Sequence, residues 1–287
     1  MALNPPPFPT GGLAQSQSRT RPDFNSVVNM APSKEPLTKE EIIEAATIAV
    51  NIISDLGLNC YLFGSTAMML YGPQHRTPRD VDIAVLADEF EDVEDVKKRI
   101  VLRSNRFVLR ASKIPENEYK ILFFKVPRPR VGPNQRRRQN GPRKECKIDI
   151  LLPGTIGLPR IPFDSLDWRR TLPLAPLKTL ILLKLFGWYE HRFDEEQRMR
   201  DKVPRDTLDI FQLLTLNVDH PEIMATGGDW CSETLLEAAK YWVCDFIGQK
   251  PSTIADWRLL GFLIKKEVHP LPSQGRIAQW IATAEVF

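Results

Sequence analysis

The chain has 287 residues, of which 43% are hydrophobic and 26% are charged, and its formal net charge is +3. This composition is ordinary for a globular protein and excludes a wholly disordered, collagen-like or coiled-coil chain. No apolar stretch reaches the roughly 20 residues that cross a bilayer, so we expect no membrane segment. The four cysteines lack CxxC spacing and the four histidines are scattered, which favours a reducing compartment without a structural zinc site.

The first 36 residues differ in composition from the rest of the chain. They contain seven prolines among Ser, Gln, Asn and Gly, a composition that cannot bury a core, so we predict a disordered tail over 1–36. Thr38 and Glu41 then match a capping box, and apolar residues recur at helical spacing up to Gly57. This pattern predicts the first helix.

Short apolar stretches between turn residues predict a mixed sheet after this helix. We expect strands at 60–63, 81–86, 107–111, 119–126 and 146–152, and helices at 67–71 and 93–102. Beyond Pro173 the pattern is helical, with helices expected at 176–192, 205–216, 231–249, 253–264 and 277–284. The sequence thus predicts an α/β (α+β) fold, with a mixed sheet and flanking helices at 37–172 and an all-helical domain at 173–287.

Three aspartates occur inside predicted strands, where aspartate is rare. Asp80 and Asp82 share one face of their strand because side chains alternate, and Asp149 is opposed to the apolar residues on either side of it. If the two strands are neighbours, three carboxylates converge, and such a cluster favours Mg²⁺ or Mn²⁺ as its counter-ion. The alternative is a strand-end turn in which the aspartates cap loop amides.

Gly64 and Ser65 lie where a predicted strand turns into a helix. The glycine allows close backbone approach, and the helix amides together with the Ser65 hydroxyl can hold phosphate oxygens. Taken by itself, Ser65 is more typical of an N-cap of the following helix, and capping and phosphate binding use the same geometry. A phosphate site beside a metal site is what phosphoryl or nucleotidyl transfer requires.

Gly64-Ser65, followed by Asp80-x-Asp82 and a later strand with Asp149, resembles the nucleotidyltransferase superfamily related to DNA polymerase beta. The helical segments around Lys184 and around Arg205-Asp206-x-x-Asp209 are similar to the second half of AbiEii-type nucleotidyltransferase-like proteins. The resemblance covers residues 58–216 and implies a nucleotidyltransferase-fold catalytic domain with a pocket facing the helices.

The resemblance also implies roles for individual residues. Gly64 and Ser65 would contact the nucleotide phosphates, Asp80 and Asp82 the metal, and Asp149 would be the third carboxylate. Lys184, with Asp206 or Asp209, would complete the pocket and the nucleotide site.

Lys184 also stands out without the resemblance, because it lies in an otherwise apolar helix where an unpaired ammonium is costly. A triphosphate would serve as its partner, and so would Asp206 and Asp209, which fall on one helix face at i and i+3. The alternative is that Lys184 reaches solvent at the helix edge. Asp206 and Asp209 can also be read as charges favoured by the helix dipole.

Residues 125–147 carry nine basic side chains against one acid. With interspersed Pro and Gly, this segment is predicted to be a flexible hairpin insertion that returns into the Asp149 strand. It could contact nucleic acid through counterion release, and Arg136 to Arg138 match a nuclear localisation signal. The alternative is a solvated loop.

These features predict a Mg²⁺- or Mn²⁺-dependent nucleotidyltransferase that moves a nucleoside monophosphate from an NTP to a hydroxyl. The acceptor, whether an RNA end, a protein or a small molecule, is left open. The alternative function is a catalytically inactive nucleotide- or RNA-binding member of the same fold. We expect a cytoplasmic protein, with the basic segment leaving a nuclear location open.

Overall fold

The structure, a computed structural model, describes residues 33, 35–72, 76–87, 92–112, 119–128, 143–219 and 230–262. Pro32–Phe287 form one compact unit, and the architecture below is that of this unit. Three sequence predictions lie wholly or mostly outside the described residues. They are the tail at 1–36, the centre of the basic segment at 129–142, and the last helix at 277–284.

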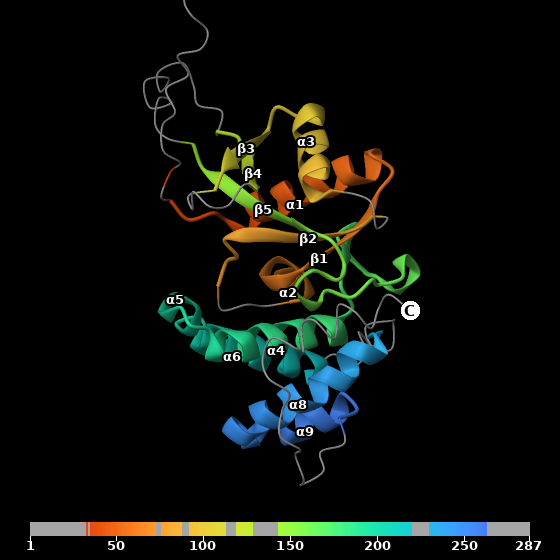
Figure 1. The fold of residues 1–287 in the computed structure, drawn as a ribbon, viewed down its shortest axis with the longest axis vertical. Helices are drawn as coiled ribbons and strands as arrows, with labels where there is room; N and C mark the ends of the chain where they lie inside the picture. Colours follow the sequence, from red (N-terminus) through yellow and green to blue (C-terminus); the bar gives the residue numbers. More distant parts are fainter. Residues whose placement is uncertain are drawn as a thin grey trace, which may run out of the picture. The chain divides into compact units, whose positions relative to one another are not determined.

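One seven-stranded mixed sheet organises the unit, in the order β3-β4-β5-β2-β1-β7-β6 (Figure 1). The strands are β1 (Asn59–Phe63), β2 (Asp80–Leu86), β3 (Phe107–Ala111), β4 (Lys120–Lys125), β5 (Glu145–Leu151), β6 (Asp167–Arg169) and β7 (Leu172–Leu174). Strand β2 is central, since it pairs with β1 in antiparallel and with β5 in parallel orientation. The predicted mixed sheet is thereby confirmed.

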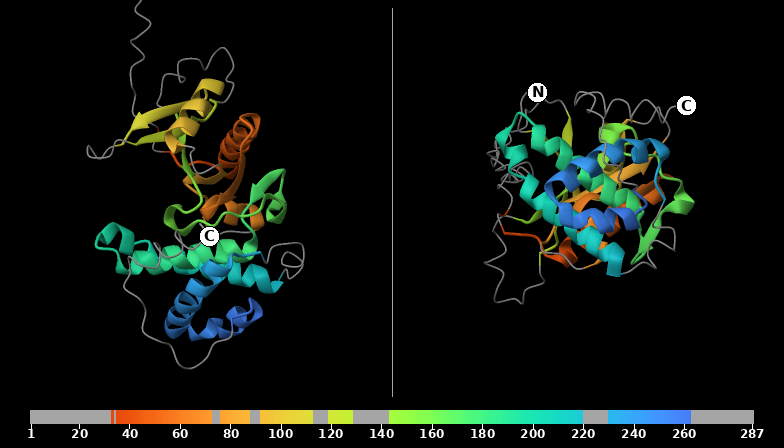
Figure 2. Two further views of the ribbon diagram at one scale, coloured as in Figure 1. Left: turned by 45° about the vertical axis from the view of Figure 1, so that its right-hand side comes forward. Right: turned by 90° about the horizontal axis from the view of Figure 1, so that it is seen from below.

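Helices cover both sides of this sheet. They are α1 (Lys39–Asp55), α2 (Gly64–Tyr71), α3 (Val93–Arg103), α4 (Leu177–Phe193), α5 (Gln197–Arg200), α6 (Val203–Asp219), α8 (Glu233–Gln249) and α9 (Ile254–Leu259). Helix α1 contacts β1, β2 and β5, and α3 contacts β3 and β5. Helix α2 lies between the sheet and α4, α6 lies beside α4, and α8 and α9 lie farther from the sheet (Figures 1 and 2).

Helix α1 forms as its sequence predicts. The Thr38 hydroxyl accepts a hydrogen bond from the Glu41 amide at 3.2 Å, and the Glu41 carboxylate accepts one from the Thr38 amide at 2.8 Å. Two amides that have no partner within the helix are thereby satisfied. Its apolar stripe, which includes Ile42, Ala49 and Ile53, is fully buried under the sheet.

The helical layer is held together by aromatic side chains. Trp188, Trp242 and Trp257 are buried, and Phe246 makes edge-on contacts with both Trp188 and Trp257. Such contacts add to the stabilisation from burial alone.

In the part of the chain that the structure describes, no helix is long and apolar enough to span a membrane.

Two strands were missing from the sequence prediction. β6 and β7 have three residues each, and β7 contains Pro173, which the pattern placed at the start of the helical region. β7 joins the sheet through a parallel pairing of Leu174 with Leu62, a long-range contact that local pattern does not reveal.

α9 is also shorter than the predicted helix at 253–264, because Gly261 at φ 90° follows it. The predicted domain boundary between residues 172 and 173 stays a prediction.

Candidate active site

The structure brings the three strand aspartates to one face of the sheet. β2 and β5 run in parallel with Asp82 opposite Asp149, and Asp80 lies two residues before Asp82 on the same side. Val81 and Ile83 point the other way and are buried. Alternation along two neighbouring strands thus produces the carboxylate cluster that the sequence predicted.

Asp82 is the most perturbed carboxylate of this cluster. Burial raises its pKa from the ordinary 3.8 to about 7, with further contributions from the negative charges of Asp80 and Asp149. Lys184 and Lys147 oppose this shift without cancelling it. Burial and the neighbouring carboxylates both disfavour the charged form of Asp82, and a divalent cation is the kind of partner that offsets such a cost.

The raised pKa predicts a pH-dependent cost in stability. Folded Asp82 retains its proton up to about pH 7, whereas the unfolded chain releases it near pH 4, so the unfolding free energy of the wild type falls as pH rises between these values. Asn cannot titrate. We expect Asp82→Asn to stabilise the metal-free chain by about 1–2 kcal/mol at pH 8 and by less at pH 5. Urea unfolding in EDTA measures this difference, and an equal or larger gain at pH 5 would contradict it.

Gly64 makes room for the Asp82 carboxylate. A Cβ atom at residue 64 would lie 2.1 Å from Oδ2 of Asp82, and the backbone φ of 64° is in the left-handed region that favours glycine. The glycine thus lets the first turn of α2 approach the carboxylate cluster. The sequence predicted a close approach at this position, and the structure shows that the approaching group is Asp82.

Gly57 offers a matched control for this contact, because it has φ 78° but open space where a Cβ would be. Both alanine variants carry the cost of a left-handed backbone, about 1 kcal/mol, but only Gly64→Ala also displaces Asp82. We expect Gly64→Ala to lower the unfolding free energy by about 1–2 kcal/mol more than Gly57→Ala does. Equal losses in urea denaturation would show that Asp82 moves aside without cost.

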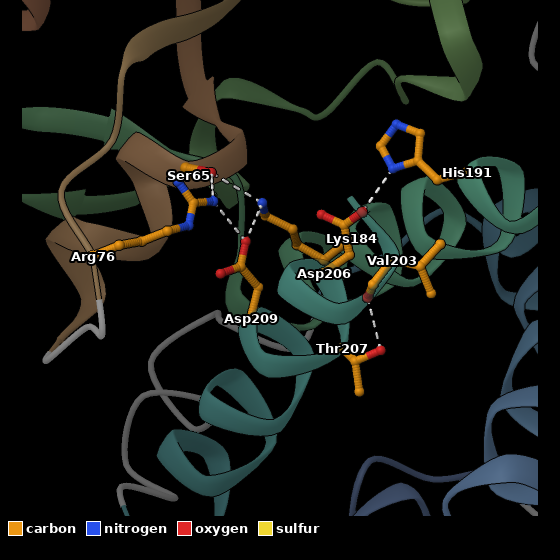
Figure 3. A network of polar contacts seen from close by, with 8 residues as sticks. All are labelled: Ser65, Arg76, Lys184, His191, Val203, Asp206, Thr207 and Asp209. Carbon is orange, nitrogen blue, oxygen red and sulfur yellow. Dashed lines mark hydrogen bonds and ion pairs between the residues drawn. The ribbon is translucent and has the colours of Figure 1, made fainter. Parts of the chain in front are cut away.

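Ser65 connects the sheet to the helical layer. It is the second residue of α2, whose N-cap is Phe63, so the prediction of Ser65 as N-cap is wrong. Its Oγ instead accepts hydrogen bonds from Nη2 of Arg76 at 2.7 Å and from Nζ of Lys184 at 3.1 Å (Figure 3). Two cations therefore meet at the hydroxyl that the sequence assigned to phosphate binding.

Asp209 on α6 is the common partner of the same two cations. Its Oδ2 accepts from Lys184 at 2.8 Å and from Arg76 at 2.9 Å, and its side chain is 1% exposed (Figure 3). Burial alone would raise the pKa of Asp209, but Lys184 and Arg76 outweigh it and lower the pKa. Of the partners that the sequence offered for Lys184, the structure provides Asp209.

Asp206 lies apart from this network. Its Oδ2 is 2.6 Å from Nδ1 of His191, two turns after Lys184 on α4 (Figure 3). Lys184 donates to Asp209 and Ser65, whereas Asp206 pairs with His191. The pair joins α4 to α6, which helps to fix the position of Lys184. His191 follows Lys184 by seven residues, a spacing that places the two side chains on one face of α4.

Lys147 is the basic residue of the site that sequence reasoning missed. It lies two residues before Asp149 on β5, and its Nζ donates to Oδ2 of Asp149 at 2.7 Å. The alternation of side chains along the strand was a signal for this placement. Arg76, by contrast, lies 133 residues from Asp209 in the chain, and no local pattern indicates that contact.

The donor set is of the type that Mg²⁺ prefers, because all three side chains offer carboxylate oxygens. Among the described residues, no three His, Cys, Asp or Glu side chains are arranged as a complete set of metal ligands. One oxygen of Asp149 is held by Lys147. The carboxylates of Asp80 and Asp82 thus fit a metal ion in chemistry and charge, while one oxygen of Asp149 is paired with the Lys147 ammonium.

Comparison with solved structures shows which fold the chain has. An antigenic nucleotidyltransferase-like protein from Paracoccidioides brasiliensis matches with a TM-score of 0.52 and 14% identity over 80% of this chain and 97% of that chain. JHP933 from Helicobacter pylori matches with a TM-score of 0.43 and 13% identity over 89% of this chain and 92% of that chain. The fold is that of nucleotidyltransferase-like proteins.

A family model described as nucleotidyl transferase AbiEii toxin, type IV toxin–antitoxin system, matches residues 49–264. The chain belongs to this AbiEii nucleotidyl transferase family. No curated protein matches the chain.

Proposed function

We propose that this protein is a Mg²⁺-dependent nucleotidyltransferase that moves a nucleoside monophosphate from an NTP to a hydroxyl acceptor. The observation that carries the proposal is the pairing of Asp82 with Asp149 in neighbouring strands, with Asp80 on the same face and Gly64-Ser65 against it. Membership of the AbiEii family supports the reaction class. RNA ends, protein side chains and small molecules are the acceptors to be tested.

In this proposal Asp80, Asp82 and Asp149 would hold the metal. A bound Mg²⁺ would supply charge neutralisation on the triphosphate and orient it. Transfer forms a bond between the acceptor oxygen and the α-phosphorus, breaks the bond to the bridging oxygen, and releases pyrophosphate. A carboxylate of the cluster would accept the proton of the attacking hydroxyl.

The remaining site residues would bind the phosphates. Ser65 and the first amides of α2 would donate hydrogen bonds to phosphate oxygens, as helix N-termini do. Lys184 already reaches the Ser65 hydroxyl, so its ammonium would lie within reach of the same phosphates. Asp209 would hold Lys184 and Arg76 in place, and Asp206 would act through His191 on the position of α4.

The experiment is incubation of the full chain with each of the four α-³²P-labelled NTPs, Mg²⁺, total RNA and lysate protein, in parallel with an EDTA control. We expect label on one acceptor class, dependent on metal and on one or more nucleobases. Nucleotide binding by equilibrium dialysis without label on RNA, protein or small-molecule fractions would instead support the binding-only function. Absence of both transfer and binding would contradict the proposal altogether.

A further inference from the structure

Lys147 holds a position within the carboxylate cluster itself. The register of β2 and β5 places it opposite Asp80, and its ammonium is 2.7 Å from Oδ2 of Asp149. The side chain is 40% exposed, so it lies at the open rim of the site and can be replaced without disturbing the core. Its charge thus lies on the same face of the sheet as the three carboxylates.

The other ammonium near the cluster is engaged elsewhere. Lys184 enters from α4 and donates to Asp209 and Ser65. Lys147 is therefore the group that compensates the charge at Asp149. A lysine that already occupies an oxygen of a carboxylate competes with a divalent ion for that carboxylate, since like charges within a few ångströms repel strongly in a partly desolvated site.

We propose that Lys147 is a built-in counter-ion that takes the place of a second divalent cation beside Asp149, so that the cluster holds one metal ion per chain. The inference rests on the proposed function for the metal, because it concerns the same carboxylates. In two-metal sites a second ion stabilises one of the reacting oxygens. Here a fixed ammonium would supply part of that charge.

The test is titration of the nucleotide-free full chain with MnCl₂ by isothermal calorimetry. We expect one Mn²⁺ per wild-type chain, and Lys147→Met should bind Mn²⁺ at least about tenfold more tightly because a competing charge is removed. Lys147→Arg, which keeps the charge, should remain within about twofold of the wild type. Circular dichroism and thermal melting establish that each variant is folded.

Lys125 provides a matched control for the change in net charge. It lies on β4 opposite Glu145, on the same face as Lys147 but two residue positions farther from Asp149. Lys125→Met should leave the Mn²⁺ affinity within about twofold of the wild type. The inference is overturned if Lys147→Met binds Mn²⁺ no more tightly than the wild type, or if Lys125→Met produces the same gain.

Failure of this inference and failure of the proposed function are distinguishable. If the wild type transfers label from an NTP but Lys147→Met binds Mn²⁺ with the same affinity as the wild type, only the inference about Lys147 is overturned. A tenfold tighter Mn²⁺ site in Lys147→Met, with no transfer from any NTP by the wild type, would support the inference and overturn the enzymatic function.

Discussion

Asp82→Asn is expected to lower nucleotidyl transfer by about 10³-fold or more, which is the largest effect among the substitutions considered. Asn has nearly the same shape as Asp, so the contact with Gly64 is retained while the negative charge is lost. The position of Asp82, opposite Asp149 and next to Asp80, makes this charge central to the cluster. The measurement is the initial rate of label transfer at saturating Mg²⁺ and NTP.

Asp95→Asn is the control for this substitution. Asp95 lies on α3, its side chain is 62% exposed, and it forms an ion pair with Lys98 on the same helix. Surface pairs of this kind contribute little, so this variant should transfer label at the wild-type rate. An Asp82→Asn variant within about tenfold of the wild type would contradict the assigned role of the cluster.

Lys184→Met is expected to lower kcat/KM for the NTP by about 10²- to 10³-fold, the range seen when one charge-stabilising donor is removed from an active site. The methionine side chain matches the lysine stem and preserves its packing in α4. Arg76 remains to pair with Asp209, so the buried carboxylate keeps a partner and the fold should persist. The loss should therefore appear in transfer and much less in the melting temperature.

Lys178→Met tests whether any lysine of α4 would give this result. Lys178 is on the same helix, is half-buried, and has no place in the phosphate network described above. It should retain wild-type kcat/KM. If Lys184→Met retained more than about a tenth of the wild-type kcat/KM, Lys184 would be a structural partner of Asp209 rather than a phosphate ligand.

The parts of the fold that local pattern controls were predicted from sequence. The capping box at Thr38 and Glu41 and the alternation that sets Asp82 against Val81 depend on residues a few positions apart. The sequence did not show whether the strands of Asp82 and Asp149 are neighbours, because the pairing and register of distant segments are properties of the whole sheet. The three-residue strands β6 and β7 were missed for the same reason.

The cations of the site were harder to predict than the carboxylates. Aspartate inside an apolar strand is conspicuous, whereas basic residues such as Arg76 and Lys147 lie in loops and in a charge-rich segment where most would be solvated. The role of Arg76 depends on a contact across the fold with Asp209, whereas alternation along β5 did signal the position of Lys147 beside Asp149. Lys184 was the exception, because an ammonium in an apolar helix signals a buried partner.

Paired labelling of the same NTP distinguishes nucleotidyl transfer from transfer or hydrolysis of the γ-phosphate. Wild-type protein is incubated with Mg²⁺, the acceptor pool and either the α-³²P or the γ-³²P form of the NTP. We expect that α-label becomes attached to the acceptor while γ-label is released as pyrophosphate. Attachment of γ-label, or release of inorganic phosphate with no label on any acceptor, would contradict it.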